Sequence, residues 1–107
     1  MTAIVNRGFM IVRAKSPFVN WANGKDDEFY LIGQNPEPSV YLIEEDFMET
    51  ETILKASFKR IFLNELHGVS DNESDFPEIT MSNFEAWFDI EFGGIVCDLE
   101  KAVLSRE

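Results

Sequence analysis

An apolar stripe between residues 49 and 67 constrains the fold of this chain more than any other feature of its sequence. Its members recur at spacings of three and four residues: Leu54, Phe58, Ile61, Phe62 and Leu66. This period predicts one amphipathic helix over residues 49–67. Glu49 and Glu51 near its start suit the helix dipole, and Gly68 after its end suits a C-terminal cap. The rest of the chain must therefore supply an apolar surface on which this helix can pack.

Three apolar runs predict the strands of that surface. Residues 8–14 and 39–44 form short apolar segments bounded by turn-forming or acidic residues. Residues 88–92 alternate strictly between apolar and acidic side chains, and a third strand is predicted over 89–98 with Gly93-Gly94 as a bulge. A helix through this last region is the alternative, which two consecutive glycines disfavour.

Two short helices are predicted from their capping signals. Ser16 followed by proline is a helix-start signal, and Gly24 is a stop signal, so a helix is expected over 17–23. The segment S-N-F-E, which begins at Ser82, has the form of a capping box and predicts a helix over 83–88.

Together these elements predict an α+β fold in a single domain spanning residues 1–107. The expected architecture is a small two-layer sandwich, in which the helix 49–67 and the two short helices cover one face of a three-stranded sheet. The other face is expected to stay partly open. The apolar run 29–32 is either a further short strand or a segment over the core. The chain from about residue 100 is either a tail or a terminal helix.

The charge of the chain narrows the classes of partner. Nine Lys and Arg residues stand against twenty Asp and Glu residues, which gives a formal charge of −11. Such a chain repels nucleic acid and anionic membrane surfaces, so we expect neither as a partner. A basic protein or a second copy of the chain is the expected partner, unless the acidity serves only solubility. No apolar stretch is long enough to span a membrane and no signal peptide is evident, so a cytoplasmic location is expected.

Residues that carry chemistry are few. Cys97 and His67 are the only cysteine and histidine, which is too few for a zinc site or a disulfide. Cys97 follows an apolar pair, and we expect it to be buried. The acidic cluster over 44–51 lacks the residue order of a calcium loop, and no glycine-rich phosphate loop is present. The sequence therefore predicts no cofactor, no metal and no catalytic residue.

Two groups of side chains are candidates for binding. Asp89 and Glu91 share one face of the predicted strand, and they would suit acid–base chemistry only if a neighbouring element buried them. Trp21 is either an aromatic anchor within a polar rim, which requires its exposure, or a core residue that follows Phe18 inward. The predicted binding residues are Asn20, Trp21, Asn23, Asp26, Asp27, Asp89 and Glu91.

Four motifs occur in a characteristic order along the chain. They are P-F-x-x-W at 17–21, V-Y-L-I at 40–43, I-F-x-x-E-L at 61–66 and F-x-x-W-F-D at 84–89. This order resembles a family of small uncharacterised bacterial proteins, over residues from about 9 to 99. The resemblance implies a bacterial origin and one compact α/β domain. It implies no residue roles, because that family carries no assigned activity.

These observations favour a non-enzymatic protein-interaction module. It would be a homodimer or an inhibitor of a basic partner, and an immunity-type protein that blocks a cationic active site is one concrete form. A small enzyme that uses carboxylates such as Asp89, Glu91 or Glu45 is the alternative. A nucleic-acid mimic, which would present its acids along one continuous surface, is a third interpretation.

Overall fold

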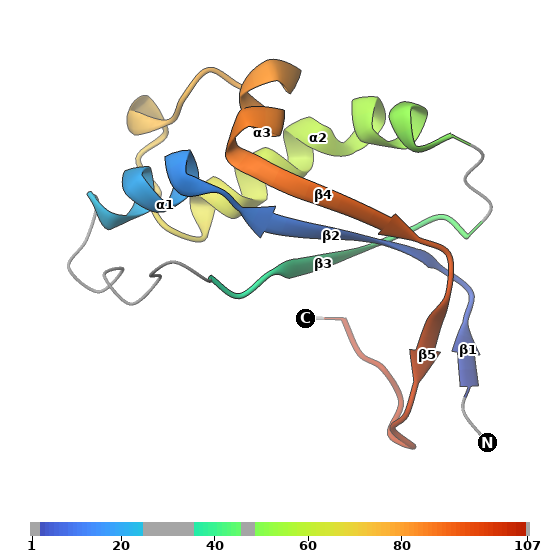
Figure 1. Cartoon of the computed structure of the whole chain (residues 1–107). Helices are drawn as coiled ribbons and strands as arrows, with labels where there is room; N and C mark the ends of the chain where they lie inside the picture. Colours follow the sequence, from blue (N-terminus) through green and yellow to red (C-terminus); the bar gives the residue numbers. More distant parts are fainter. Residues whose placement is uncertain (1–2, 25–35, 46–48, 107) are drawn as a thin grey trace.

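The computed structural model describes residues 3–24, 36–45 and 49–106, and it has an α+β fold in two layers (Figure 1). A three-stranded antiparallel sheet has the order β3-β2-β4. Its strands are β2 (Gly8–Ala14), β3 (Ser39–Ile43) and β4 (Phe88–Gly93). The predicted α+β class and the three-stranded sheet are confirmed.

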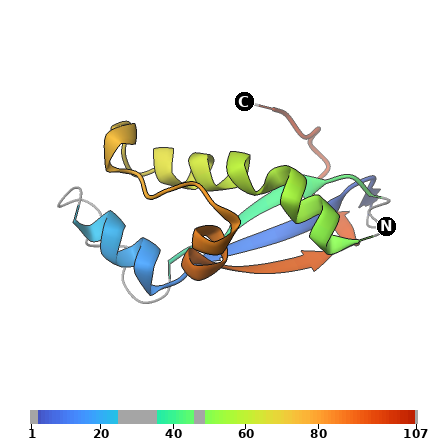
Figure 2. The ribbon, with the colours of Figure 1, turned by 90° about the horizontal axis from the view of Figure 1, so that it is seen from above.

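Three helices lie on one side of this sheet; in the view from above, the first lies beyond the end of β2 and the other two lie over the strands (Figure 2). They are α1 (Ser16–Asn23), α2 (Thr50–His67) and α3 (Met81–Trp87), and a 3-10 turn over Glu73–Asp75 precedes α3. The long helix and both short helices were predicted within two residues of their observed bounds. The other face of the sheet carries no helix of the described chain, as expected.

Strict alternation along β2 separates the two faces of the sheet. Met10 and Val12 point toward the helices and are buried, and their cross-strand neighbours on that face include Tyr41 and Ile90. Phe9 and Ile11 point the other way and are only half-buried. The helical layer therefore holds the core, and the opposite face remains open.

Aromatic side chains dominate the core. Phe62, Phe84 and Phe88 are fully buried, and their ring centroids lie 5.3 to 5.7 Å apart in tilted or edge-on pairs. The predicted stripe of α2 supplies Phe58, Phe62 and three aliphatic neighbours, of which only Leu54 is less than fully buried. Burial of this one stripe fixes the helix on the sheet.

A second, two-stranded sheet projects from the first. It pairs β1 (Ala3–Val5) with β5 (Val96–Asp98), and we call these two strands, together with Ile95 immediately before β5, the arm. Val5 is paired with Val96, whereas the next described pair is Phe9 with Gly93, so three residues of one strand oppose two of the other. Such an extra residue is a β-bulge, which bends a ribbon. The prediction of one strand over 89–98 is therefore wrong in part, and β1 was not predicted.

The helix caps also differ from those predicted. Ser16 is the first residue of α1, and the capping position is held by Lys15, whose side chain makes no capping hydrogen bond. Thr80, not Ser82, caps α3, since its Oγ1 accepts a hydrogen bond of 3.1 Å from the Asn83 N–H. The described part of the C-terminal segment, residues 99–106, contains no helix. The run 29–32 lies outside the described residues.

Candidate functional site

Trp21 packs inward, which is one of the two arrangements that the sequence left open. Its ring lies 5.8 to 6.0 Å from the rings of Phe18, Phe76 and Trp87, and its Nε1 donates a 3.0 Å hydrogen bond to the backbone oxygen of Asp75. The tryptophan thus joins α1 to the loop before α3, and this is a structural role. Asn20 and Asn23 are exposed beside it. Asp26 and Asp27 lie outside the described residues.

Asp89 and Glu91 lie on the open face of β4, where both are exposed. Glu91 pairs with Arg13 at 3.2 Å, and Asp89 pairs with Lys15 at 3.7 Å. Each carboxylate therefore faces a cation on β2 or next to it, and solvent reaches both. Acid–base chemistry here would depend on burial of these carboxylates by a neighbouring element, and no element of the described chain covers them.

The centre of the open face is apolar. Val40 and Leu42 of β3 are 61% and 51% exposed, and they lie directly across from Ile11 and Phe9 of β2. The ring of Phe9 extends over Gly93 of β4, the residue paired with it on the other side. Four apolar side chains from two strands thus form a continuous strip, and the ion pairs of Arg13 and Lys15 border it.

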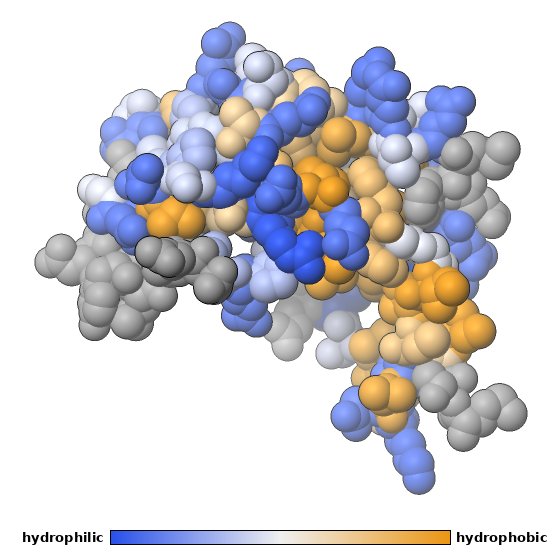
Figure 3. All heavy atoms as spheres, viewed as in Figure 1, coloured by the Kyte–Doolittle hydropathy of each residue, from blue (hydrophilic) through white to orange (hydrophobic). Residues whose placement is uncertain are grey.

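The arm region and the C-terminal segment also expose apolar side chains, and one of these, Leu104, lines a hollow together with Leu42 of the strip. Ile4 and Ile95 of the arm region are 76% and 75% exposed, and Leu99, Val103 and Leu104 are exposed beyond them. With Val40 and Leu42, these are all of the large hydrophobic side chains that the described residues expose. Figure 3 shows apolar atoms gathered over the arm. We call the open face, the arm and residues 99–106 the apolar side.

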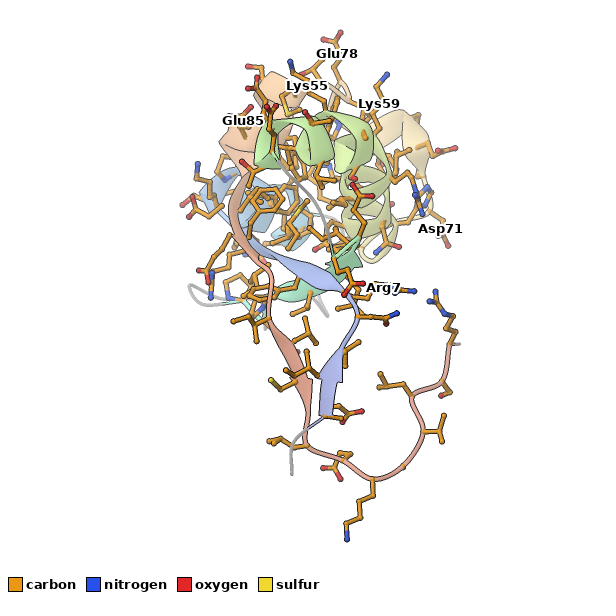
Figure 4. All side chains as sticks on the ribbon, turned by 90° about the vertical axis from the view of Figure 1, so that its right-hand side faces the viewer. Arg7, Lys55, Lys59, Asp71, Glu78 and Glu85 are labelled. Atoms are coloured by element: carbon orange, nitrogen blue, oxygen red, sulfur yellow. The ribbon has the colours of Figure 1, made fainter. Side chains whose placement is uncertain are left out.

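The charge of the apolar side differs from that of the whole chain. Segments 3–15, 39–43 and 88–106 contain five Lys or Arg residues and four Asp or Glu residues, so their formal charge is +1. The remaining segments have a formal charge of −12, which together with this +1 gives the −11 of the whole chain. In Figure 4 the labelled Glu78, Glu85, Lys55 and Lys59 lie on the helical layer, away from the arm. Most of the described acidic side chains therefore lie outside the apolar side, and Glu44 and Glu45 border it next to Leu42.

A polar cluster lies at the other face of β3, where it meets α2. Tyr41 donates a short hydrogen bond to Glu65 and accepts one of 2.9 Å from the Asn64 amide. Ser39 donates to the same carboxylate at 3.1 Å. Burial, followed by the hydrogen bond to Glu65, raises the pKa of the Tyr41 phenol above its ordinary range. A hollow of about 310 Å³ adjoins the cluster, with Arg60 on its wall. The hydrogen bonds attach β3 to α2.

The lone cysteine and the lone histidine do not form a site. Cys97 lies on β5 and is exposed, so the expectation that it is buried is wrong. His67 ends α2, where it contacts Glu73 at 3.5 Å and Asp71 at 3.9 Å, and that end of α2 lies across the domain from β5 (Figure 1). Among the described residues no cluster of three or more His, Cys, Asp or Glu side chains could hold a metal ion. Within the same residues, no helix is long and apolar enough to cross a membrane.

The fold and this surface define a small α+β domain with one helical layer, one open antiparallel sheet and a projecting two-stranded arm. Comparison of the chain with protein-family models, with curated proteins and with solved structures gave no match. The family resemblance drawn from the four motifs therefore stays a prediction.

Proposed function

We propose that this protein is a non-enzymatic protein-interaction module that binds its partner through the apolar side. The observation that carries this proposal is the placement of the exposed aliphatic side chains. All seven that the described residues expose belong to the open face, the arm or residues 99–106. Single exposed aliphatic residues are normal, but an apolar patch bordered by polar groups, such as the strip on the open face with its ion pairs, is typical of an interaction site.

The chemistry of the surface also supports binding over catalysis. Asp89 and Glu91, the best candidates for acid–base chemistry, are exposed and paired with cations. Burial and the hydrogen bond to Glu65 raise the pKa of Tyr41, and its hydroxyl already contacts Glu65 and Asn64. These groups hold structural elements together, and a protein surface is the simplest ligand for the strip beside them.

The negative charge of the chain outside the apolar side favours a second form of this function, in which the partner is a basic protein. A charge of −12 outside the apolar side would attract a basic protein and speed its association. The protein could then be an inhibitor of the immunity type, with a cationic active site as its target. A cytoplasmic location and a bacterial origin belong to this proposal, and the unpaired Cys97 fits a reducing compartment.

The proposal is tested by comparing wild type with the double variant Val40→Thr/Leu42→Thr. Threonine keeps the β propensity of the strand and removes much of the apolar surface. Ala56→Thr, on the exposed side of α2, is the matched control. Each protein is assayed for self-association by light scattering, and for defined partners by affinity capture followed by binding measurements with the purified partner. We expect the double variant to weaken the complex at least about tenfold and the control to leave it unchanged. A wild type that stays monomeric and binds no partner through these residues contradicts the proposal.

A further inference from the structure

We propose that the partner on the apolar side is a second copy of this chain, and that the arm of each copy lies across the open sheet face of the other. This inference rests on the proposed function, since it names the occupant of the same surface. Four observations carry it: the incomplete packing of the arm, the shape of the molecule, the charge of the apolar side and its apolar area.

The arm lacks the packing that normally supports a β-ribbon. It contains two strands of three residues each, and an isolated two-stranded ribbon is marginally stable in water. Ile4 and Ile95 expose about three-quarters of their surface there, and no described helix covers them. A second surface against the arm would complete its packing.

The main domain and the projecting arm form an angle, and a recess lies at the corner between them. The Cα radius of gyration is 15.4 Å, whereas a compact chain of this length has about 13 Å. Figures 1 and 4 show the arm descending from the sheet, and together with Figure 2 they show the C-terminal segment curving back at the side of the sheet, beyond β3. A hollow of about 440 Å³ lies at this corner, between Val5, Leu42 and Leu104. It has room for aliphatic side chains from the arm of another molecule.

Two such molecules can close on each other about a two-fold axis. The arm of one copy fills the recess of the other, and the same contact is repeated in the opposite direction. Because a two-fold interface uses the same patch on both copies, arm and open face must both be available on one chain, as they are here. No free arm remains after two copies have joined, so the assembly stops at a dimer.

Charge favours a copy of the chain at this surface over a basic partner. Two chains of −11 repel each other, and the repulsion is smallest when their near-neutral sides meet. Arg13 and Lys15 already neutralise Glu91 and Asp89 within the open face. A basic protein would instead be drawn to the acidic remainder of the surface. The two binding modes therefore respond to salt in opposite directions.

The apolar area is of the right order for a dimer. A fully exposed Val, Leu or Ile side chain presents roughly 60–120 Å² of apolar surface, so the seven partly exposed side chains present roughly 300–600 Å² together. A standard interface buries about 800 Å² on each partner. The half-buried Phe9 and Ile11, the backbone of the arm and the bordering ion pairs can supply the rest.

Sedimentation velocity over a range of protein concentrations tests this inference. Wild type should sediment as a monomer–dimer equilibrium, and dimer formation should strengthen as NaCl rises from about 0.05 to 0.5 M, because salt screens the self-repulsion. The arm variant Ile4→Thr/Ile95→Thr and the face variant Val40→Thr/Leu42→Thr should each weaken the dimer at least about tenfold. Ala56→Thr should not, and far-ultraviolet circular dichroism with tryptophan fluorescence confirms that each variant folds.

A mixture of the two variants tests the pairing of arm with face. The face variant retains an intact arm and the arm variant retains an intact face, so a mixed dimer has one complete contact where each variant dimer has none. The mixture should therefore associate more strongly than either variant alone. A mixture no stronger than its components, a dimer that both variants leave intact, or open-ended oligomers would each overturn the inference.

The failure of this inference differs from the failure of the proposed function. A wild type that stays monomeric at every salt concentration overturns the dimer. If that monomer still binds another protein, and Val40→Thr/Leu42→Thr abolishes the binding, the proposed function stands and only the occupant is wrong. If no complex of either kind forms, both are overturned.

Discussion

Replacing Gly93 by alanine tests how the open sheet face is packed. A Cβ atom at this position would lie 2.1 Å from Cζ of Phe9 and 2.3 Å from its Cε1, which is far closer than any van der Waals contact. The neighbouring Gly94 provides the control, because a Cβ atom there would meet nothing within 4 Å. Alanine at 93 therefore requires the Phe9 ring to swing away from β4.

The size of the effect depends on whether that ring is present. In wild type the clash is with the outer end of a half-buried ring on the open face, so it should cost about 1 kcal/mol in the free energy of unfolding, the low end for overpacking. In a Phe9→Ala background the obstacle is gone, and alanine in place of glycine within a strand should stabilise by about 0.5–1 kcal/mol. The coupling between positions 9 and 93 should thus be about 1.5–2 kcal/mol.

Urea unfolding followed by circular dichroism measures this coupling. The four proteins of the cycle are wild type, Gly93→Ala, Phe9→Ala and the double variant, all at one protein concentration. Gly94→Ala in wild type should change the free energy of unfolding by no more than about 0.5 kcal/mol. If Gly93→Ala has the same effect with and without the Phe9 ring, the described packing of Phe9 on Gly93 is refuted.

Three further predictions concern the core, the polar cluster and the arm. Phe62→Ala should cost about 3–5 kcal/mol because it empties a fully buried site, whereas Val103→Ala, at a position 93% exposed, should change stability little in the same unfolding assay. The folded protein holds the Tyr41 proton more tightly than the unfolded chain does, so the stability that this proton contributes is complete below about pH 10 and is lost as the pH rises further. Tyr41→Phe should therefore reduce the decrease in unfolding free energy above about pH 10. At neutral pH the same substitution should cost about 1–2 kcal/mol, because Glu65 loses a hydrogen-bond donor. An unchanged dependence of the unfolding free energy on alkaline pH would contradict this. In the monomer, at low protein concentration, Cys97 should react with a thiol reagent about as fast as in urea, whereas dimer formation should slow the reaction because Cys97 is paired with Ile4 on the arm; strong protection of the monomer would contradict the described exposure of Cys97.

The elements with a long or strict pattern could be predicted from the sequence. The apolar stripe of α2 can be recognised from residue spacing alone, because a helix of eighteen residues makes about five turns and its buried face recurs in each turn. The alternation of Phe88 to Phe92 is equally local, and it correctly indicates which side chains of β4 face the core. The open sheet face could be predicted because the three predicted helices are enough to cover only one of the two faces of the sheet.

The arm could not be predicted, because its cause is not local. Three apolar residues at positions 3–5 are too few to show a period, and they form a strand only because residues 96–98 lie beside them. The interruption of the predicted strand 89–98 arises from the bulge, which depends on the register between two distant segments. Cys97 was misjudged for the same reason, since its apolar neighbours belong to the arm and not to the core.

The caps and Trp21 illustrate a different limit. Ser82 and Thr80 both have hydroxyl groups that can cap a helix. Which of them does so depends on the residue at which the preceding loop ends and the backbone becomes helical. The sequence placed Trp21 beside Phe18, but its hydrogen-bond partner is the backbone of Asp75, more than fifty residues away. A local motif shows that a tryptophan can pack inward, and only the tertiary structure supplies the acceptor for its indole N–H.

The pairing of distant segments also sets an order of events during synthesis. β2 is the central strand, and it pairs on one side with β3 and on the other with β4, about eighty residues further along the chain. Until the ribosome has added residues 88–93, at about 5–20 residues per second, β2 has only one of its two neighbouring strands, β3. Such non-local pairing is slow, so the nascent chain exposes one edge of the apolar strand β2 until residues 88–93 have been synthesised. Folding of this domain is therefore completed after β4 has been made, and a chain that stalls before it would be a target for chaperones or proteases.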